Sequence, residues 1–137
     1  MSDDTPAQAV QALFAGDTMS KAMGIELLVV APGHVKVAMK VRADMANGHG
    51  ICHGGIIFSL ADSAFAFACN SHGIAMVAAG AQIEFLAPAT LGDTLVAAAH
   101  ERHRTERLGV YDVTVENGSG ARIAEFRGRC ARLRTAL

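Results

Sequence analysis

The sequence predicts an α+β fold in which an antiparallel sheet of about five to six strands wraps around one long buried helix. Three observations lead to this prediction. Residues 55–71 form an apolar run of helical length, β-like segments lie on both sides of it, and turns rich in glycine or proline separate those segments. Because a single helix cannot cover both faces of a sheet, we expect the outer face to be available to a second subunit.

Composition bounds the class of protein. The chain has 137 residues, of which 51% are apolar and 18% charged, so it can bury one core, and we expect residues 1–137 to form a single domain. A formal net charge of -1, one Tyr and no Trp argue against nucleic acid as a partner.

The sequence also argues against export and membrane insertion. Residues 1–6 lack the basic flank and the apolar run of a secretory signal. The longest weakly charged stretch, residues 56–69, is shorter than the roughly 20 apolar residues that span a bilayer. We therefore expect a cytoplasmic protein that does not enter the membrane.

The segment 1–22 is expected to be helical. Residues 7–15 have the apolar spacing of a short amphipathic helix and end at Gly16, which suits a helix C-cap. Asp17 or Thr18 then provides the N-cap of a further helical turn.

Six segments have the alternating pattern of strands. The first two are joined by Pro32 and Gly33, a hairpin turn, and residues 117–120, Asn-Gly-Ser-Gly, give a second strong hairpin signal before the last strand. These signals indicate a largely antiparallel sheet. The segments are residues 25–30, 35–41, 76–87, 94–103, 109–116 and 122–133.

The helix at residues 55–71 is apolar all round, so we expect it to be buried on nearly every side. Asp62 lies in its middle and is the only formally charged side chain between Asp44 and Glu84. Burying an unpaired carboxylate costs several kcal/mol, and Asp is a poor residue for a helix interior. Asp62 therefore either accepts hydrogen bonds that fix the packing or serves chemistry.

His53, Gly54 and Gly55 stand directly before this run. The first turn of a helix has unpaired backbone N–H groups and a partial positive charge, which can hold a carbonyl oxygen as negative charge develops on it. Glycine at these positions lets a ligand reach the backbone. The alternative is a plain glycine turn beside an incidental histidine.

The spacing limits how Gly54 and Asp62 can cooperate. They are eight residues apart, which in a helix is about 12 Å along the axis and roughly 80° around it. They cannot both touch one carbonyl group of a substrate. If both serve one reaction, they come from different subunits whose helices run antiparallel across a two-fold axis, which predicts a dimer with active sites at its interface.

The combined pattern resembles the hotdog-fold acyl-CoA thioesterases of the phenylacetic-acid-degradation type. It consists of Asn47, five intervening residues, His53-Gly54-Gly55 and then Asp62, and it continues through residues 83–88, 91–94 and 109–112. The resemblance implies a helix wrapped by an antiparallel sheet, dimers that pair into homotetramers, and hydrolysis of acyl-CoA thioesters without metal or organic cofactor. It points to phenylacetyl-CoA or hydroxyphenylacetyl-CoA as the substrate.

Site residues follow from the same resemblance. Asp62 is expected to attack the thioester carbonyl or to activate water, and the N–H of Gly54 to stabilise the oxyanion. Asn47 and His53 would orient the thioester. Relatives often place a Ser or Thr on the strand after the helix, where this chain has residues 77–80, Val-Ala-Ala-Gly. The role of that residue is then absent or is filled by another side chain, for which Ser63 and Gln82 are candidates. Gly55 and Ser63 are expected to bind the substrate.

Three other interpretations remain. A hotdog dehydratase or hydratase would use a His and an acidic residue as its acid–base pair, for which His53 and Asp62 are candidates. A metal-binding module would use His49, Cys52 and His53, although a fourth ligand is not evident. A non-catalytic acyl-CoA-binding protein would keep the fold but would not need the carboxylate of Asp62.

Overall fold

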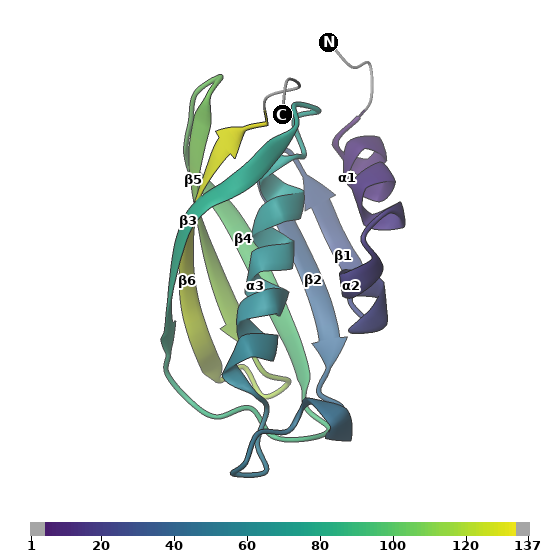
Figure 1. The fold of residues 1–137 in the computed structure, drawn as a ribbon, viewed down its shortest axis with the longest axis vertical. Coiled ribbons are helices and arrows are strands. Elements are labelled where there is room, and N and C mark those ends of the chain that lie inside the picture. Colours follow the sequence, from purple (N-terminus) through teal and green to yellow (C-terminus); the bar gives the residue numbers. More distant parts are fainter. Residues whose placement is uncertain (1–4, 134–137) are drawn as a thin grey trace.

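The computed structural model describes residues 5–133 (Figure 1). Two helices come first, then two strands, a short 3-10 turn, the long helix and four further strands. Their bounds are α1 Pro6–Ala15, α2 Thr18–Ala22, β1 Glu26–Ala31, β2 His34–Lys40, the 3-10 turn Ala43–Met45, α3 Gly54–Cys69, β3 Met76–Phe85, β4 Thr94–Arg104, β5 Leu108–Glu116 and β6 Arg122–Arg132.

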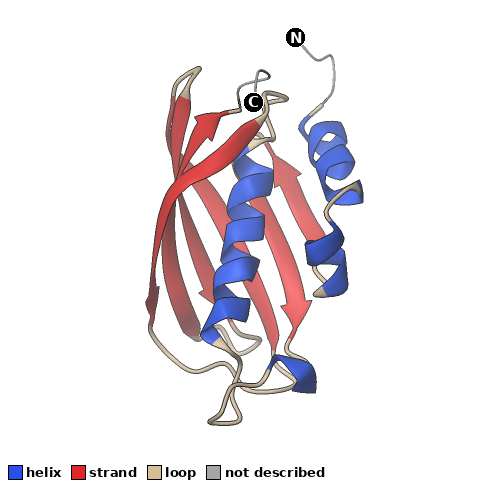
Figure 2. Cartoon of the chain, in the orientation of Figure 1, coloured by secondary structure: helices blue, strands red, loops and turns tan. Residues whose placement is uncertain are grey.

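The strands form one sheet of six in the order β1-β2-β4-β5-β6-β3, and every neighbouring pair is antiparallel. Helix α3 lies against one face of this curved sheet, while α1 and α2 lie beside β1 at the edge opposite β3 (Figure 2). The predicted α+β fold, with an antiparallel sheet wrapped around a long helix, is confirmed. No helix within residues 5–133 combines the length and the apolar character needed to cross a membrane.

Both predicted hairpin turns are present. Pro32 and Gly33 join β1 to β2, and Gly33 has a φ of 69°, a left-handed conformation that glycine adopts without strain. At the turn between β5 and β6, the side-chain oxygen of Asn117 accepts hydrogen bonds from the N–H groups of Ser119 and Ala121. These turns fix the register of the strand pairs that carry the core.

The C-terminal end of α3 is tied to the sheet by side-chain hydrogen bonds. The hydroxyl of Ser71 donates to the carbonyl of Ala68 at 2.7 Å and accepts from the N–H of Gly33 at 2.8 Å. Beyond it, the carboxylate of Glu101 lies 2.7 Å from His72 Nε2 and accepts from the hydroxyl of Tyr111 at 2.8 Å. The helix is therefore held in a defined position along the sheet.

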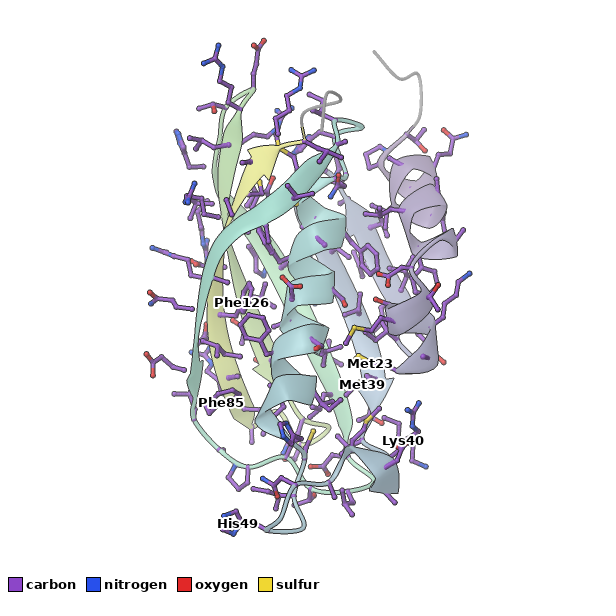
Figure 3. The ribbon with its side chains drawn as sticks, in the orientation of Figure 1. Met23, Met39, Lys40, His49, Phe85 and Phe126 are labelled. Atoms are coloured by element: carbon purple, nitrogen blue, oxygen red, sulfur yellow. The ribbon has the colours of Figure 1, made fainter. Side chains whose placement is uncertain are left out.

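The core lies between α3 and the inner face of the sheet. On β6, Ala124, Phe126, Gly128 and Cys130 are buried, whereas Arg127 and Arg129 on the other face are exposed, as the alternation predicts. Figure 3 shows Phe126 between the sheet and the helix. Its ring packs against Phe65 of α3 at 5.8 Å between centroids.

Gly128 has no room for a side chain. A Cβ at this position would lie 2.8–2.9 Å from three ring atoms of Phe65, which is itself fully buried. We expect Gly128→Ala to destabilise the protein by about 1–3 kcal/mol, because the ring must leave its preferred position. Chemical denaturation at one fixed protein concentration measures this change.

Gly118→Ala is the matched control for this prediction. A Cβ at Gly118 meets no atom within 4 Å, so the free energy of unfolding should change by less than about 0.5 kcal/mol. Equal stabilities of the Gly128 variant and the wild-type protein would show that the contact with Phe65 relaxes without cost.

Burial of α3 differs from the sequence-based expectation. The helix is buried where it faces the sheet, but six residues on the other side are half-buried or exposed within the single chain. They recur at helical spacing and form one strip along the helix, which we call the open stripe. The prediction of burial on nearly every side was wrong for one chain, because apolar residues all round a helix do not show what covers each side. The open stripe comprises Gly55, Phe58, Ser59, Asp62, Ser63 and Ala66.

Strand β3 forms an edge of the sheet beside the helix (Figure 1). Within residues 5–133 it pairs with β6 alone, and residues 77–82, Val-Ala-Ala-Gly-Ala-Gln, are exposed. Val77 keeps 46% of its surface exposed. A long apolar edge with unpaired backbone groups is a template for pairing with another chain.

Candidate active site

The N-terminus of α3 has one open hydrogen-bond donor. His53 is the N-cap, and its Nδ1 accepts from the N–H of Gly55 at 2.9 Å. The N–H of Gly54, the first helical residue, donates to no group within residues 5–133. Because the first turn carries the positive end of the helix dipole, this N–H is suited to hold an oxygen that becomes negative.

The loop before the helix is shaped by Asn47. Its side-chain oxygen accepts from the N–H groups of His49 at 2.9 Å and Ile51 at 3.2 Å, and its own N–H donates to the carbonyl of Ile51 at 2.8 Å. These bonds assign the oxygen and leave the amide nitrogen of Asn47 without a partner among the described residues. His49 is exposed at the tip of the loop and points away from the sheet (Figure 3).

Asn47 and Gly54 share a hollow of about 470 Å³ that opens at the start of α3. Phe85, at the end of β3, lies against Gly54, and an added Cβ on the glycine would be 3.2 Å from the tip of its ring (Figure 3). Two residues with an unused hydrogen-bond donor thus line an otherwise apolar space, as ligand sites commonly require. The other lining residues are Ile51, Cys52, Ile57, Leu86, Ala87 and Pro88.

Asp62 lies on the open stripe, two turns beyond the hollow. Its carboxyl group is half-buried, and none of the hydrogen bonds or ion pairs of residues 5–133 involves it. Burial raises the pKa of Asp62, and the negative charge of Asp17 raises it further. An unpaired carboxylate with a raised pKa is a candidate for acid–base or nucleophilic chemistry.

Within one chain, the two parts of the candidate site lie apart along α3: the N–H of Gly54 and the carboxylate of Asp62. Asp62 does not line the hollow that contains Asn47 and Gly54. This is the separation expected from their spacing along α3. One chain therefore presents a hydrogen-bond donor at one place and a carboxylate at another.

Two predicted substrate-binding residues have partners inside the chain. The N–H of Gly55 is used by His53, and the hydroxyl of Ser63 lies 3.1 Å from the hydroxyl of Ser20 on α2. The structure thus places Ser63 beside the N-terminal helical segment and outside the hollow.

Aromatic residues on α3 are not the walls of the hollow. Phe65 and Phe67 are fully buried, and Phe58 packs edge-on against Phe126 at 5.3 Å between ring centroids. The aromatic ring in the hollow belongs to Phe85.

Sequence reasoning missed several residues around the site. Phe85, Leu86 and Pro88 line the hollow although only the family pattern drew attention to their segment. Asp17 was expected only as a helix cap, yet its charge acts on Asp62 across a separation of 45 residues in the chain. A close approach of this kind leaves no signal in one sequence.

The interpretation as a metal-binding module finds no support in the described residues. Within residues 5–133, no three His, Cys, Asp or Glu side chains come together in a group that could hold a metal ion. Of the three residues considered, His49 is exposed at the loop tip, Cys52 is buried and His53 caps α3.

Comparison with known proteins identifies the family. The model of the thioesterase superfamily matches residues 49–124, which include His53, Gly54 and Asp62. Acyl-coenzyme A thioesterase PaaI of Escherichia coli strain K12 is 46% identical over 126 residues, which cover 92% of this chain and 90% of that protein.

Solved structures agree with this match. The E. coli PaaI protein from the phenylacetic acid degradation operon superposes with a TM-score of 0.93 at 45% identity over 94% of each chain. A hypothetical thioesterase protein of Streptococcus pneumoniae TIGR4, determined with coenzyme A, has a TM-score of 0.84 at 27% identity and covers 90% of this chain and 96% of its own. The chain therefore belongs to the thioesterase superfamily.

Proposed function

We propose that this protein is an acyl-CoA thioesterase that hydrolyses a small aryl-acetyl-CoA, phenylacetyl-CoA or a hydroxyphenylacetyl-CoA, to the free acid and CoA. One observation carries the proposal: Gly54, whose N–H donates to no described group, lines an apolar hollow at the positive end of α3. That arrangement can hold the oxygen of a thioester carbonyl and stabilise it as an oxyanion.

The relatives support the activity and the substrate class. The E. coli relative is an acyl-coenzyme A thioesterase whose gene lies in the phenylacetic acid degradation operon, and the S. pneumoniae structure contains coenzyme A. The hollow fits an aromatic acyl group, because Phe85, Ile51 and Leu86 surround it with apolar surface.

The proposed enzyme is a dimer whose active sites lie at the subunit interface. Two surfaces support this assembly: the exposed apolar edge β3, and the open stripe of α3, which the chain covers only in part. Pairing of two β3 edges would extend the sheet across both chains and bring the two α3 helices together in antiparallel orientation. The open stripe contains Asp62, so each carboxylate would reach the partner's hollow. Pairing of two such dimers gives the homotetramer.

Asp62 of one protomer then acts on a thioester held in the other. As a general base it takes a proton from water, the oxygen bonds to the carbonyl carbon, and the C–S bond breaks. CoA leaves as a thiolate that receives the proton. As a nucleophile, Asp62 instead bonds to the carbonyl carbon while the C–S bond breaks, which gives a mixed anhydride and CoA thiolate. Water then hydrolyses the anhydride to the free acid and the Asp62 carboxylate, and the proton that this step releases passes to the thiolate. Both routes use groups of the protein and water.

Four other residues would assist this reaction. The free amide nitrogen of Asn47 and the ring of His53 flank Gly54 and orient the thioester. Gly55 keeps the helix start accessible to the substrate, since it adds no side chain there. The hydroxyl of Ser63 is the group nearest along the chain to Asp62 that can hold a water molecule.

Release of free thiol from a panel of CoA thioesters tests the function. We expect the highest kcat/KM for phenylacetyl-CoA and hydroxyphenylacetyl-CoA, with lower values for benzoyl-CoA and for long straight-chain acyl-CoAs. The apolar hollow discriminates by shape, so one methylene should change kcat/KM about 10- to 200-fold.

Failure of this test would take one of two forms. Binding of the thioesters without release of thiol would favour the non-catalytic acyl-CoA-binding protein. Hydration of enoyl-CoA, without hydrolysis of any thioester, would favour the dehydratase or hydratase.

A further inference from the structure

A chain of hydrogen bonds links the N-terminal segment to the residue beside Asp62. Asp17, the N-cap of α2, accepts from the N–H of Ser20 at 3.0 Å through one oxygen and from the hydroxyl of Ser20 at 2.6 Å through the other. The hydroxyl of Ser20 lies 3.1 Å from that of Ser63 on α3. Because Ser20 has one hydroxyl proton and gives it to Asp17, Ser63 is the donor in this last bond.

This series of hydrogen bonds goes beyond what a helix cap requires. A cap needs one acceptor for the N–H of the third residue, and the first oxygen of Asp17 already provides it. The second oxygen continues through Ser20, which is 1% exposed, to α3. The links hold a carboxylate close to the open stripe at the position of Asp62.

We propose that Asp17 is a positioning residue for Asp62: Ser20 and Ser63 fix the carboxylate of Asp17 beside the open stripe, where its negative charge acts on Asp62. This inference rests on the proposed function, in which Asp62 performs the chemistry. It extends the site to α2, an element that the hollow and the helix start do not include.

The charges around Asp62 favour this assignment. Burial is the larger cause of the raised pKa of Asp62, and the negative charge of Asp17 raises this pKa further. The negative charge of Asp62 in turn contributes to raising the pKa of the Cys69 thiol on the same helix. Within residues 5–133 no Lys, Arg or His pairs with Asp62, so nothing described offsets Asp17.

A more basic carboxylate suits either proposed route. The rate of proton abstraction or of nucleophilic attack rises with the basicity of the attacking oxygen, provided that the group is still ionised at the working pH. A second carboxylate raises basicity without donating a hydrogen bond that would weaken the base.

The pH dependence of kcat/KM tests this role in Asp17→Asn. Asparagine keeps an oxygen that can cap α2 but removes the charge. Without that charge the pKa of Asp62 falls, so Asp62 ionises at lower pH and the acidic limb of the profile moves to lower pH. On the plateau, kcat should decrease about two- to tenfold because the base is weaker.

Two further variants separate charge from structure. Ser63→Ala breaks the hydrogen-bond chain but keeps the charge of Asp17, so its acidic limb should move less than that of Asp17→Asn. Asp44→Asn removes an exposed carboxylate that pairs with Arg42 and should leave the limb in place. If asparagine at position 17 prevents folding, Asp17→Ser also keeps a capping oxygen without the charge.

The outcomes distinguish this inference from the function on which it rests. A folded Asp17→Asn protein of native size whose acidic limb coincides with that of the wild type would overturn the inference while leaving the thioesterase intact. Full activity of Asp62→Asn would instead remove the role of Asp62, and with it the role of Asp17.

Discussion

Asp62→Asn will lower thioester hydrolysis by about 10²- to 10⁴-fold, the contribution typical of a positioned base or of the loss of a nucleophile. Asparagine keeps the shape of the side chain but can neither accept a proton from water nor attack the carbonyl. No described group pairs with the carboxylate, so the substitution leaves no described partner unsatisfied, and the proposed dimer should persist. Single-turnover release of thiol, with size measured by light scattering, gives both quantities.

Ser59→Ala is the matched control for Asp62→Asn. Ser59 lies on the same open stripe, and its hydroxyl donates to the carbonyl of Gly55 within the helix at 2.9 Å. Its loss should change kcat less than about threefold, because the serine donates within its own helix and has no part in the chemistry. Retention of the wild-type rate by Asp62→Asn would contradict the proposed mechanism directly.

Gly54→Pro will reduce kcat about 10²- to 10³-fold, the typical cost of removing one oxyanion donor. Proline lacks the N–H that is proposed to hold the oxyanion, yet it is favoured at the first position of a helix. His53 has ψ of 134°, which suits the residue before a proline. The substitution therefore removes one donor with little effect on the helix, and steady-state kinetics on phenylacetyl-CoA measures the result.

Gly54→Ala separates the loss of the donor from steric effects. It also places a Cβ 3.2 Å from the tip of Phe85, but it keeps the N–H. Phe85 is 53% exposed and can move, so we expect mainly a change in KM. Equal loss of kcat in Gly54→Ala and Gly54→Pro would mean that the added atoms, rather than the missing N–H, impair the enzyme.

Mixed oligomers test whether the Gly54 and the Asp62 that serve one active site come from different chains. If Gly54 and Asp62 of one site belong to different protomers, co-expression of Asp62→Asn with Gly54→Pro gives hybrids with one intact site and one doubly altered site. Random pairing restores about a quarter of the wild-type activity, because half of the dimers are hybrids and each has one of two sites. Purified hybrids without activity would place both residues in one site of one chain.

Secondary structure was largely predictable because local signals agreed. Alternating side chains on β6, the Pro32-Gly33 turn and the capping residue Asp17 each specify a local conformation that the tertiary fold retains. The open stripe of α3 was not predictable in the same way. Apolar and small residues fit a core, a subunit interface or a ligand channel equally well, and only the sheet determines which side it covers.

The sequence pointed to candidate site residues where a side chain or a backbone group was unusual for its expected surroundings. Asp62 drew attention because a carboxylate in an apolar helix is costly, and Gly54 because a helix start offers free donors. Phe85 and Asp17 drew none, since an aromatic at the end of a strand and an Asp before a helix are ordinary. Packing across the fold places Phe85 against Gly54 and lets the charge of Asp17 act on Asp62.

The open stripe limits which substitutions the proposed dimer can accept during evolution. In a two-fold dimer of antiparallel helices, the stripe packs against a copy of itself, so residues near the axis meet their own counterparts. In such a dimer, one altered codon at Ser59 would therefore introduce two altered side chains into the same contact. The effects are paired: a larger residue meets a second larger residue, and a charge meets an identical charge. In the proposed dimer, self-complementarity would restrict such positions more severely than their half-buried surroundings in a single chain suggest.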